Sequence, residues 1–278
     1  MSQTKSVAGS TKYLVECSMM IAIAAVLSVI KIVDMPYGGS VTIASMLPIV
    51  IIAYRYGVCF KGLLADLAYG AIQQLLGLKN LGYVSEWYSV IAVIVLDYLL
   101  AFVVLGFGGA FRGKFASQRT ELTVGALVAG ALRFVCHFVS GITVWAGWGV
   151  PTKMAVIHSL SYNSVYMLPE IAVLAVAAWY LGGALDFTSE QPVRLQRKPR
   201  DAYASYAIVG TLVLIGGFIA DIAMIFSKLQ NEDNGEWLIE GRKSVKWVNV
   251  AIITAVCLIA GISLLAYGKA QSKKTRAN

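Results

Sequence analysis

The sequence predicts an all-α polytopic membrane protein: a six-helix bundle followed by a two-helix C-terminal hairpin, with eight transmembrane helices in all. Of the 278 residues, 58% are hydrophobic and only 14% are charged, whereas soluble domains carry about 25% charged residues. The charges gather in short gaps between apolar runs of about 20 residues, which is the length that crosses a bilayer core. A transmembrane β-barrel would need short segments of alternating hydrophobicity instead.

The elements follow from these apolar runs. The first run covers about 13–33, and a loop containing Pro36, Tyr37, Gly38, Gly39 and Ser40 ends it, because Pro and paired Gly break a helix. We expect Pro48 to break or kink the second run. Pro169 is the expected kink of the sixth run, which is long enough to be tilted. The spans of the six-helix part are expected at about 13–33, 41–56, 59–78, 84–107, 122–145 and 154–185.

Two further apolar runs, at about 203–226 and 248–267, predict the C-terminal hairpin. The expected domains are therefore a six-helix membrane domain over 1–185, a basic cytoplasmic linker over 186–202, and a hairpin with a basic tail over 203–278. The residues themselves indicate no role for this last part.

The loops predict the orientation, because Lys and Arg concentrate on the cytoplasmic side of a membrane protein. Loops on one side carry Lys5, Lys12, Arg55, Lys61, Arg112, Lys114, Arg119, Arg194, Arg197, Lys198 and Arg200, and loops on the other carry Lys31, Lys79 and Lys153. We therefore expect a multi-pass protein of the cell membrane with both termini in the cytoplasm. The net charge of +8 reflects this asymmetry and is not a sign of nucleic-acid binding.

Motifs for catalysis, metal binding and nucleotide binding are missing from the sequence. The four Cys are scattered without a CxxC pair, and HExxH and the G-x-x-x-x-G-K-[ST] phosphate loop do not occur. Ser140–Gly141 lies beside His137, but Phe138 stands where a nucleophile motif needs Gly. We therefore expect no enzyme, no cofactor and no metal site, and any ATP dependence must come from partner proteins.

Leu132–Trp145 combines an apolar run with ionisable side chains. On a helix, Arg133, His137 and Gly141 fall at i, i+4 and i+8 and share one face. Ionisable groups in hydrocarbon are costly and usually line a cavity or meet a partner, so this face should look into the protein.

Depth estimates at 1.5 Å per residue place polar and aromatic side chains of the fourth, fifth and sixth spans in the outer half of the membrane. These candidate site residues are Trp87, Asp97, His137, Trp145, His158 and Asn163. A lone carboxylate calls for a cation, aromatic faces favour a flat ring, and Asn suits an aminopyrimidine edge. The pattern predicts an outward-opening pocket for a small, flat, cationic, nitrogen-rich solute.

Structural roles are the alternatives for the same residues. Asp97 could form a buried ion pair with Arg133, and His137 could make a helix–helix hydrogen bond with no ligand. Trp87, Tyr88, Trp145 and Trp148 could form an interfacial aromatic belt. For Asp66, Glu170 and Asp221 we favour helix packing over ligand contact.

Four motifs resemble the thiamine-specific S-component family of energy-coupling-factor (ECF) transporters. They are MPYGGSV at Met35–Val41, LDY at Leu96–Tyr98, LRFVCHFVSGITVW at Leu132–Trp145 and SLSYNSVYMLP at Ser159–Pro169. They occur in the family's order and spacing over about residues 13–185. The last two spans lie outside this resemblance.

The resemblance implies an S-component-like bundle that binds thiamine with high affinity in an outward-facing pocket between its fourth, fifth and sixth helices. It also implies docking on a module of one transmembrane coupling protein and two ATP-binding subunits. Asp97 would face the thiazolium region, Tyr98, His137, Trp145 and Asn163 would line the site, and Pro36–Ser40 would act as a lid. Ser18 and Ala22 match the family's docking step for the coupling protein.

The sequence departs from the family pattern at three positions. His158 stands where Tyr is usual, Gly39 where some members carry a stacking Trp, and Ser18 where the docking step has Ala. A stand-alone secondary transporter, with Asp97 and His137 as a proton relay, is the alternative function.

Overall fold

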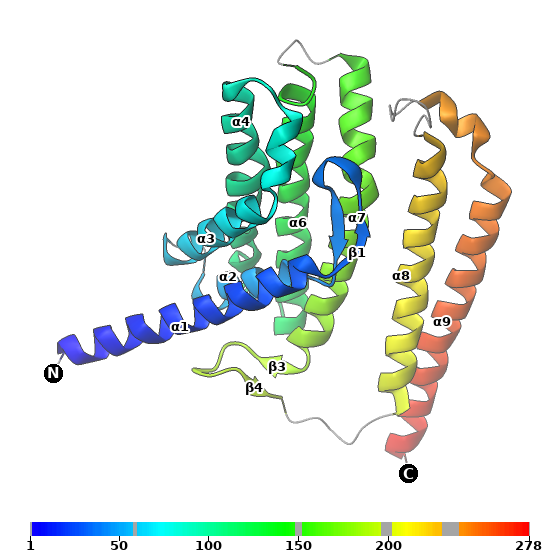
Figure 1. Cartoon of the computed structure of the whole chain (residues 1–278). Helices are drawn as coiled ribbons and strands as arrows, with labels where there is room; N and C mark the ends of the chain where they lie inside the picture. The colour runs from blue at the N-terminus through cyan, green and yellow to red at the C-terminus, as the bar shows by residue number, and fades with distance from the viewer. Residues whose placement is uncertain (1, 58–59, 148–151, 196–201, 230–238, 278) are drawn as a thin grey trace. The chain divides into compact units, whose positions relative to one another are not determined.

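The computed structural model describes residues 2–57, 60–147, 152–195, 202–229 and 239–277. The chain divides into two compact units, Met1–Arg194 and Leu195–Asn278, and helices dominate both (Figure 1). Six helices of the described residues are long and apolar enough to cross a membrane, which confirms the helical membrane fold. They cover Thr11–Val29, Trp87–Gly109, Gln118–Thr143, Lys153–Gly182, Ser205–Leu229 and Trp247–Gln271.

The expected second and third spans form helices that are shorter than the others. Helix α2 (Leu47–Tyr56) has 10 residues and α3 (Phe60–Leu76) has 17, whereas a straight crossing takes about 20. The start of the expected second span forms a strand and a turn instead. Pro48 lies in the first turn of α2 and does not break it, because a proline there has no N–H that needs a helical partner.

Helix α2 forms the centre of the first unit. Leu47–Tyr54 is buried throughout, as a helix that is apolar on every side requires. It packs against α1 (Ser2–Val29), α3, α6 (Gln118–Thr143) and the 3-10 segment η4 (Val104–Gly109). A Cβ on Gly125 of α6 would overlap the Gly108 carbonyl of η4, so glycine permits the close backbone approach that membrane helices use.

The fourth span changes its helical winding along its length. It runs from α4 (Trp87–Val93) through a π-helix, η3 (Ile94–Leu100), to α5 (Ala101–Val103) and η4. Asp97 and Tyr98 lie on the π-helix, a rare winding that is frequent at functional sites. The sequence analysis expected a uniform helix here.

Helices α6 and α7 (Lys153–Gly182) pack side by side, while α1 runs obliquely to both (Figure 1). The side chains of Ser117 and Thr152 cap the two helices by accepting hydrogen bonds from backbone N–H groups of the first turn. Helix α7 continues through Pro169.

Two short antiparallel hairpins accompany the helices of the first unit. Strands β1 (Lys31–Asp34) and β2 (Ser40–Thr42) enclose the 3-10 turn η1 (Pro36–Gly38), and β2 contacts α7. Strand β3 (Leu185–Asp186) pairs with β4 (Val193–Arg194). The all-α prediction did not include these strands, which are too short for a pattern of alternation to be read from the sequence.

The second unit contains the expected C-terminal hairpin. Helices α8 (Ala202–Leu229) and α9 (Trp247–Ala277) pack along each other, and the 3-10 turn η5 (Ile239–Ser244) precedes α9. Thr254 donates to Asp221 at 2.7 Å, and the rings of Tyr206 and Tyr267 meet edge-on at 5.1 Å. The Asp221–Thr254 contact fits the packing role favoured for Asp221.

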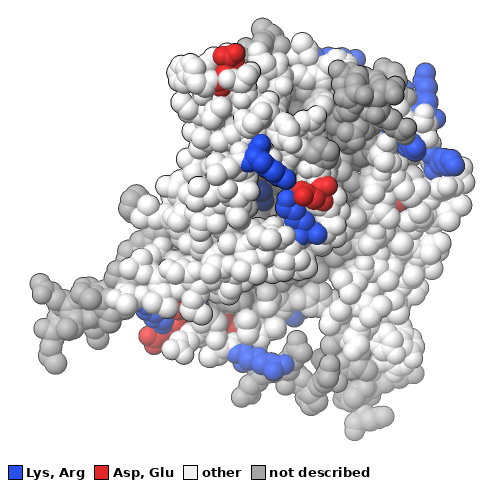
Figure 2. Space-filling model, viewed as in Figure 1, with Lys and Arg blue, Asp and Glu red and all other residues white. Residues whose placement is uncertain are grey.

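Charged side chains occupy small patches in the view of Figure 2, and wide areas between them carry no charge. Large apolar side chains are exposed along α1 and α9, for example Met19 at 60% and Ile259 at 68%. Apolar surface of this extent is typical of a protein covered by lipid or by a partner.

Candidate functional site

The carboxylate of Asp97 connects the fourth span to the C-terminal end of α6. Its Oδ1 lies 3.0 Å from Nδ1 of His137, and its Oδ2 accepts from Oγ of Ser140 at 2.7 Å and from Nε1 of Trp145 at 3.1 Å. We call these four residues the Asp97 cluster. The side chains of Asp97 and His137 are only 13% and 11% exposed, so the cluster is an interior polar network of the kind that membrane proteins reserve for function.

The spacing on α6 explains how the cluster forms. His137 and Ser140 are three residues apart and therefore lie on one face of the helix, while Trp145 follows in the turn after Thr143. Gly141 lies against the side chain of Ser159, which brings α7 close to the same face. As predicted, this face looks into the protein.

Arg133 has a different partner from the one considered in the sequence analysis. Its guanidinium carbon lies 4.3 Å from the centroid of the Phe102 ring, a cation–π distance. Among the described residues, Asp97 contacts the His137 imidazole and forms no ion pair with Arg133, so the alternative Asp97–Arg133 pair is wrong. Arg133 therefore packs over Phe102 and not on the Asp97 carboxylate.

Asn163 of α7 is fixed by contacts with the protein. Its Nδ2 donates to the Ser159 carbonyl at 2.8 Å and to the His137 carbonyl at 3.4 Å. Its Oδ1 accepts from the Tyr166 hydroxyl at 2.7 Å. Because both ends of the amide are engaged, Asn163 holds α7 and Tyr166 in place beside the cluster.

An aromatic stripe on α7 extends the site. His158, Tyr162 and Tyr166 follow at intervals of four and lie on one helix face. The His158 and Tyr162 rings stack at 6.4 Å, Tyr162 and Tyr166 meet at 5.6 Å, and Tyr166 lies 6.1 Å from the His137 ring. His158 therefore belongs to the same network as the cluster through two intervening rings.

Tyr98 and Trp87 differ in their surroundings. The Tyr98 hydroxyl accepts from Nδ2 of Asn80 at 2.9 Å and donates to the Gly77 carbonyl at 3.3 Å. Trp87 is 73% exposed, and its ring meets that of Tyr88 edge-on at 5.9 Å. The geometry of Trp87 favours the interfacial-belt alternative.

The loop Pro36–Ser40, which we call the lid loop, is attached to α7 near the Asp97 cluster. The side chain of Pro36 lies outside the described residues. The Gly39 amide donates to the Tyr162 hydroxyl at 3.0 Å, and Gly39 packs on the Tyr166 ring. Just beyond the loop, Thr42 donates from its amide and its hydroxyl to the carboxylate of Glu170 at 2.5 and 2.6 Å.

Sequence reasoning missed four residues of this arrangement: Asn80, Ser140, Tyr162 and Tyr166. Ser140 had a readable signal, because it stands three residues after His137. The two tyrosines had one as well, because they continue the period of four that begins at His158. Asn80 lies in a 3-10 turn, η2 (Leu78–Tyr83), and only the fold brings it to the site.

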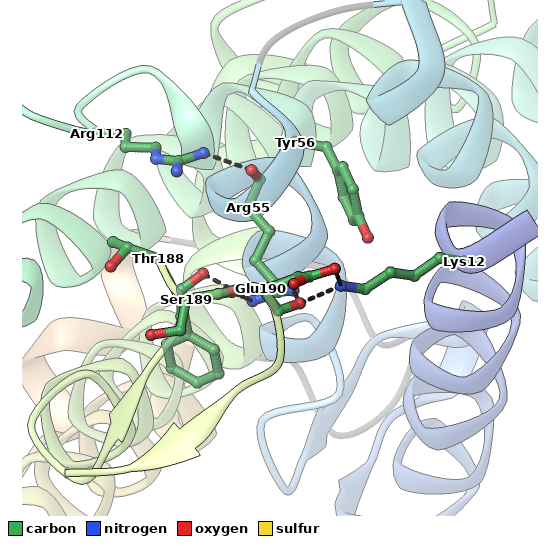
Figure 3. A pocket seen from close by; sticks show the side chains of 8 residues that line it. Lys12, Arg55, Tyr56, Arg112, Thr188, Ser189 and Glu190 are labelled. Carbon is green, nitrogen blue, oxygen red and sulfur yellow. Dashed lines mark hydrogen bonds and ion pairs between the residues drawn. The ribbon is translucent and has the colours of Figure 1, made fainter. Parts of the chain in front are cut away.

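A second charged network lies where α1, α2 and the β3–β4 turn meet (Figure 3). Arg55 donates to Glu16 at 3.0 and 3.2 Å and to the Phe187 carbonyl at 2.8 Å, and Tyr56 donates to Glu16 at 2.6 Å. We call Glu16, Arg55 and Tyr56 the Arg55 cluster. Residues around it line a cavity of about 210 Å³: Lys12, Arg55, Tyr56, Arg112, Phe187, Thr188, Ser189 and Glu190.

The polar groups of this cavity are already paired with one another. Arg112 donates to backbone carbonyls of α2, and Lys12 pairs with Glu190. Hydrogen bonds from the side chains of Ser189 and Thr188 hold the pKa of Asp186 at about 2. The network joins three elements and offers little to a ligand.

Comparisons with known proteins identify the family of the chain. Residues 14–187 match the family model described as thiamine transporter protein (Thia_YuaJ), and this range includes all of the Asp97 cluster. The thiamine transporter ThiT of Bacillus subtilis (strain 168) is 30% identical over 174 residues, which are 59% of this chain and 86% of the relative. A solved structure of ThiT from Listeria monocytogenes has 24% identity and a TM-score of 0.48, over 61% of this chain and 92% of that one.

The family match spans well over half of the chain and agrees with the range of the resemblance seen in the sequence. It confirms that the molecule is a transport protein and not an enzyme. The chain belongs to the thiamine transporter protein family.

Proposed function

We propose that the chain captures thiamine at the Asp97 cluster as the substrate-binding subunit, or S-component, of an ATP-driven ECF vitamin importer. The observation that carries this proposal is a buried carboxylate, hydrogen-bonded to an imidazole and an indole, in a member of a thiamine transporter family. Thiamine has a cationic thiazolium and a flat aminopyrimidine. A desolvated carboxylate and aromatic faces complement both.

The site would consist of Asp97, Tyr98, His137, Trp145, Asn163 and His158, with the lid loop closing over it. Trp145 would have two roles, because its Nε1 donates to the carboxylate and its ring would stack on the substrate. Trp87 has the weakest support, since it is exposed and packs on its neighbour Tyr88.

The partners would be a transmembrane coupling protein and two ATP-binding subunits of an ECF module. Ser18 and Ala22 are both exposed and lie at i and i+4 on α1. Small side chains at that spacing let another helix approach closely. This supports α1 as the docking face for the coupling protein.

The membrane orientation follows from the loop charges, with both termini in the cytoplasm. Residues 1–185 would then form the substrate-binding domain and 186–202 the cytoplasmic linker. The hairpin and tail over 203–278 would add two further spans whose role the proposal leaves unassigned.

Titration calorimetry of the purified chain with thiamine tests the capture step. A saturable heat of binding is expected at micromolar or lower thiamine. No heat of binding at micromolar thiamine would contradict the proposal. Co-purification of the full chain with ATP-binding subunits tests the coupling step separately.

The Asp97–His137 hydrogen bond also supports a second candidate, a proton-coupled transporter that works without ATP-binding subunits. A carboxylate and an imidazole in contact inside a span can relay a proton. Reconstitution of the chain alone decides between the two. Thiamine uptake driven by a pH gradient would favour the second candidate, and uptake only with the ATP-binding subunits would favour the first.

A further inference from the structure

Nε2 of His137 in the Asp97 cluster and Oδ1 of Asn80 are buried and have no hydrogen-bond partner among the described residues. Asn80 is only 7% exposed. A buried acceptor without a partner costs free energy, and native proteins carry few of them. Asp66 and Gln74 carry unpartnered atoms as well, but the Asn80 amide also bonds Tyr98, next to Asp97, and lies against Gly38 of the lid loop.

Asn80 reaches the site by two contacts. Its Nδ2 donates to the hydroxyl of Tyr98, the residue next to Asp97 on the π-helix. Its amide also lies against Gly38 of the lid loop, where a Cβ would overlap it. Gly38 has φ +103, which an L side chain rarely adopts. Because glycine has no Cβ, the loop backbone can pack directly against the Asn80 amide.

The lid loop makes a second contact with the same turn. The rings of Tyr37 and Tyr83 meet at 5.1 Å, and Tyr83 ends the turn that contains Asn80. On its other side, the loop contacts Tyr162 and Tyr166. Asn80 therefore lies between the lid loop and the π-helix that carries Asp97.

Both open atoms are acceptors. When Asp97 accepts from Nδ1 of a neutral His137 imidazole, Nε2 of that ring is an acceptor. The Nδ2 of Asn80 donates to the Tyr98 hydroxyl, and its Oδ1 is an acceptor without a partner among the described residues. The substrate must then supply donors, and the amino group of an aminopyrimidine carries two N–H bonds.

We propose that Asn80 is a specificity-determining residue of the substrate site, whose Oδ1 accepts a hydrogen bond from the amino group of the bound heterocycle. This inference rests on the proposed thiamine function. It adds a residue from outside the fourth, fifth and sixth spans and makes the turn beneath the lid loop part of substrate recognition.

The test compares thiamine with its 4-oxo analogue, in which a carbonyl replaces the amino group, by calorimetry on the purified full chain. Asn80→Ala should weaken thiamine binding by about tenfold and leave analogue binding within about twofold. The preference for thiamine over the analogue should therefore fall by nearly the same factor. Asn80→Asp keeps an acceptor oxygen in place and should keep the preference, which provides a second readout if Asn80→Ala is unstable.

Gln74→Leu is the matched control. Gln74 is another buried amide with unpartnered atoms, 8% exposed and on α3, so its loss should leave the preference unchanged. Equal weakening of both ligands by Asn80→Ala, or loss of the preference in Asn80→Asp, would overturn the inference. Absence of thiamine binding by the wild-type chain would instead overturn the proposed function.

Discussion

The Asp97 cluster and the Arg55 cluster are both charged networks in an apolar protein, and they differ in how completely they are paired. In the Arg55 cluster, the guanidinium meets a carboxylate and backbone carbonyls, and Tyr56 completes the coordination of Glu16. In the Asp97 cluster the carboxylate is paired, but Nε2 of the adjoining His137 is open.

The difference in pairing assigns a structural role to the Arg55 cluster and a binding role to the Asp97 cluster. A fully paired network stabilises the fold and has nothing left for a ligand. A network that keeps a buried acceptor open gives up about 1–3 kcal/mol, and where aromatic rings and a loop surround it, as at the Asp97 cluster, that acceptor can serve a ligand. The four predictions that follow test this division, from the largest effect to the smallest.

Arg55→Met should destabilise the protein most, by about 3 kcal/mol, because it leaves the partly buried Glu16 without its cation and removes the Arg55 hydrogen bonds to backbone carbonyls. Thermal unfolding in detergent measures this loss. Thiamine affinity of the folded variant should remain unchanged, because the Arg55 cluster only joins elements.

Lys12→Met is the control for that change. Lys12 pairs with Glu190, whose side chain is 92% exposed, and exposed ion pairs contribute about 0–1 kcal/mol. A variant at Arg55 that unfolds like wild type but binds thiamine poorly would reverse the roles of the two clusters.

Asp97→Asn should weaken thiamine binding by about 1.5–3 kcal/mol, the value of a hydrogen bond to a charged group. The amide keeps the shape and an acceptor for Ser140 and Trp145, so unfolding should change less than affinity does. Calorimetry measures the affinity, and thermal unfolding measures the stability.

Asp66→Asn is the matched control, since Asp66 is a fully buried carboxylate on α3 whose oxygens have no partner among the described residues. Its substitution should leave thiamine affinity intact. If the Asp97→Asn variant binds thiamine as tightly as wild type, Asp97 has a structural role only.

These contrasts also show what a sequence can predict. Apolar runs predicted the helices, because length and hydropathy determine which segments cross a membrane. The position of His137 on an inward face followed from helical periodicity alone. Its pairing with Asp97, and the position of Arg133 over Phe102, depended on which helices become neighbours.

Local irregularities of the backbone could not be predicted from the sequence. The π-helix that presents Asp97 and the strand that replaces the start of the second span arise from packing, which overrides intrinsic propensity. Asn80 had no periodic signal, because a six-residue turn contains no repeat. The sequence therefore predicted several of the residues that the structure brings together around Asp97, while the contacts of the lid loop with Asn80 and Tyr162 required the fold.

Glu170→Gln tests the attachment of the lid loop and should have a smaller effect. The carboxylate accepts from both the amide and the hydroxyl of Thr42, and the neutral side chain weakens both bonds. We expect about 1 kcal/mol, seen as roughly fivefold faster thiamine release in stopped-flow measurements. An unchanged release rate would mean that the lid loop moves independently of Thr42.

The smallest effect is expected at Trp87, which the sequence analysis named as a candidate site residue. Trp87→Ala should leave thiamine affinity within about twofold, because an exposed ring that packs on Tyr88 loses little when it is removed. Trp145→Phe is the comparison, since it removes the N–H that donates to Asp97 while keeping an aromatic face. Calorimetry on both variants should rank Trp145 well above Trp87. A fivefold or greater loss at Trp87 would instead extend the binding site from the Asp97 cluster to the exposed end of α4.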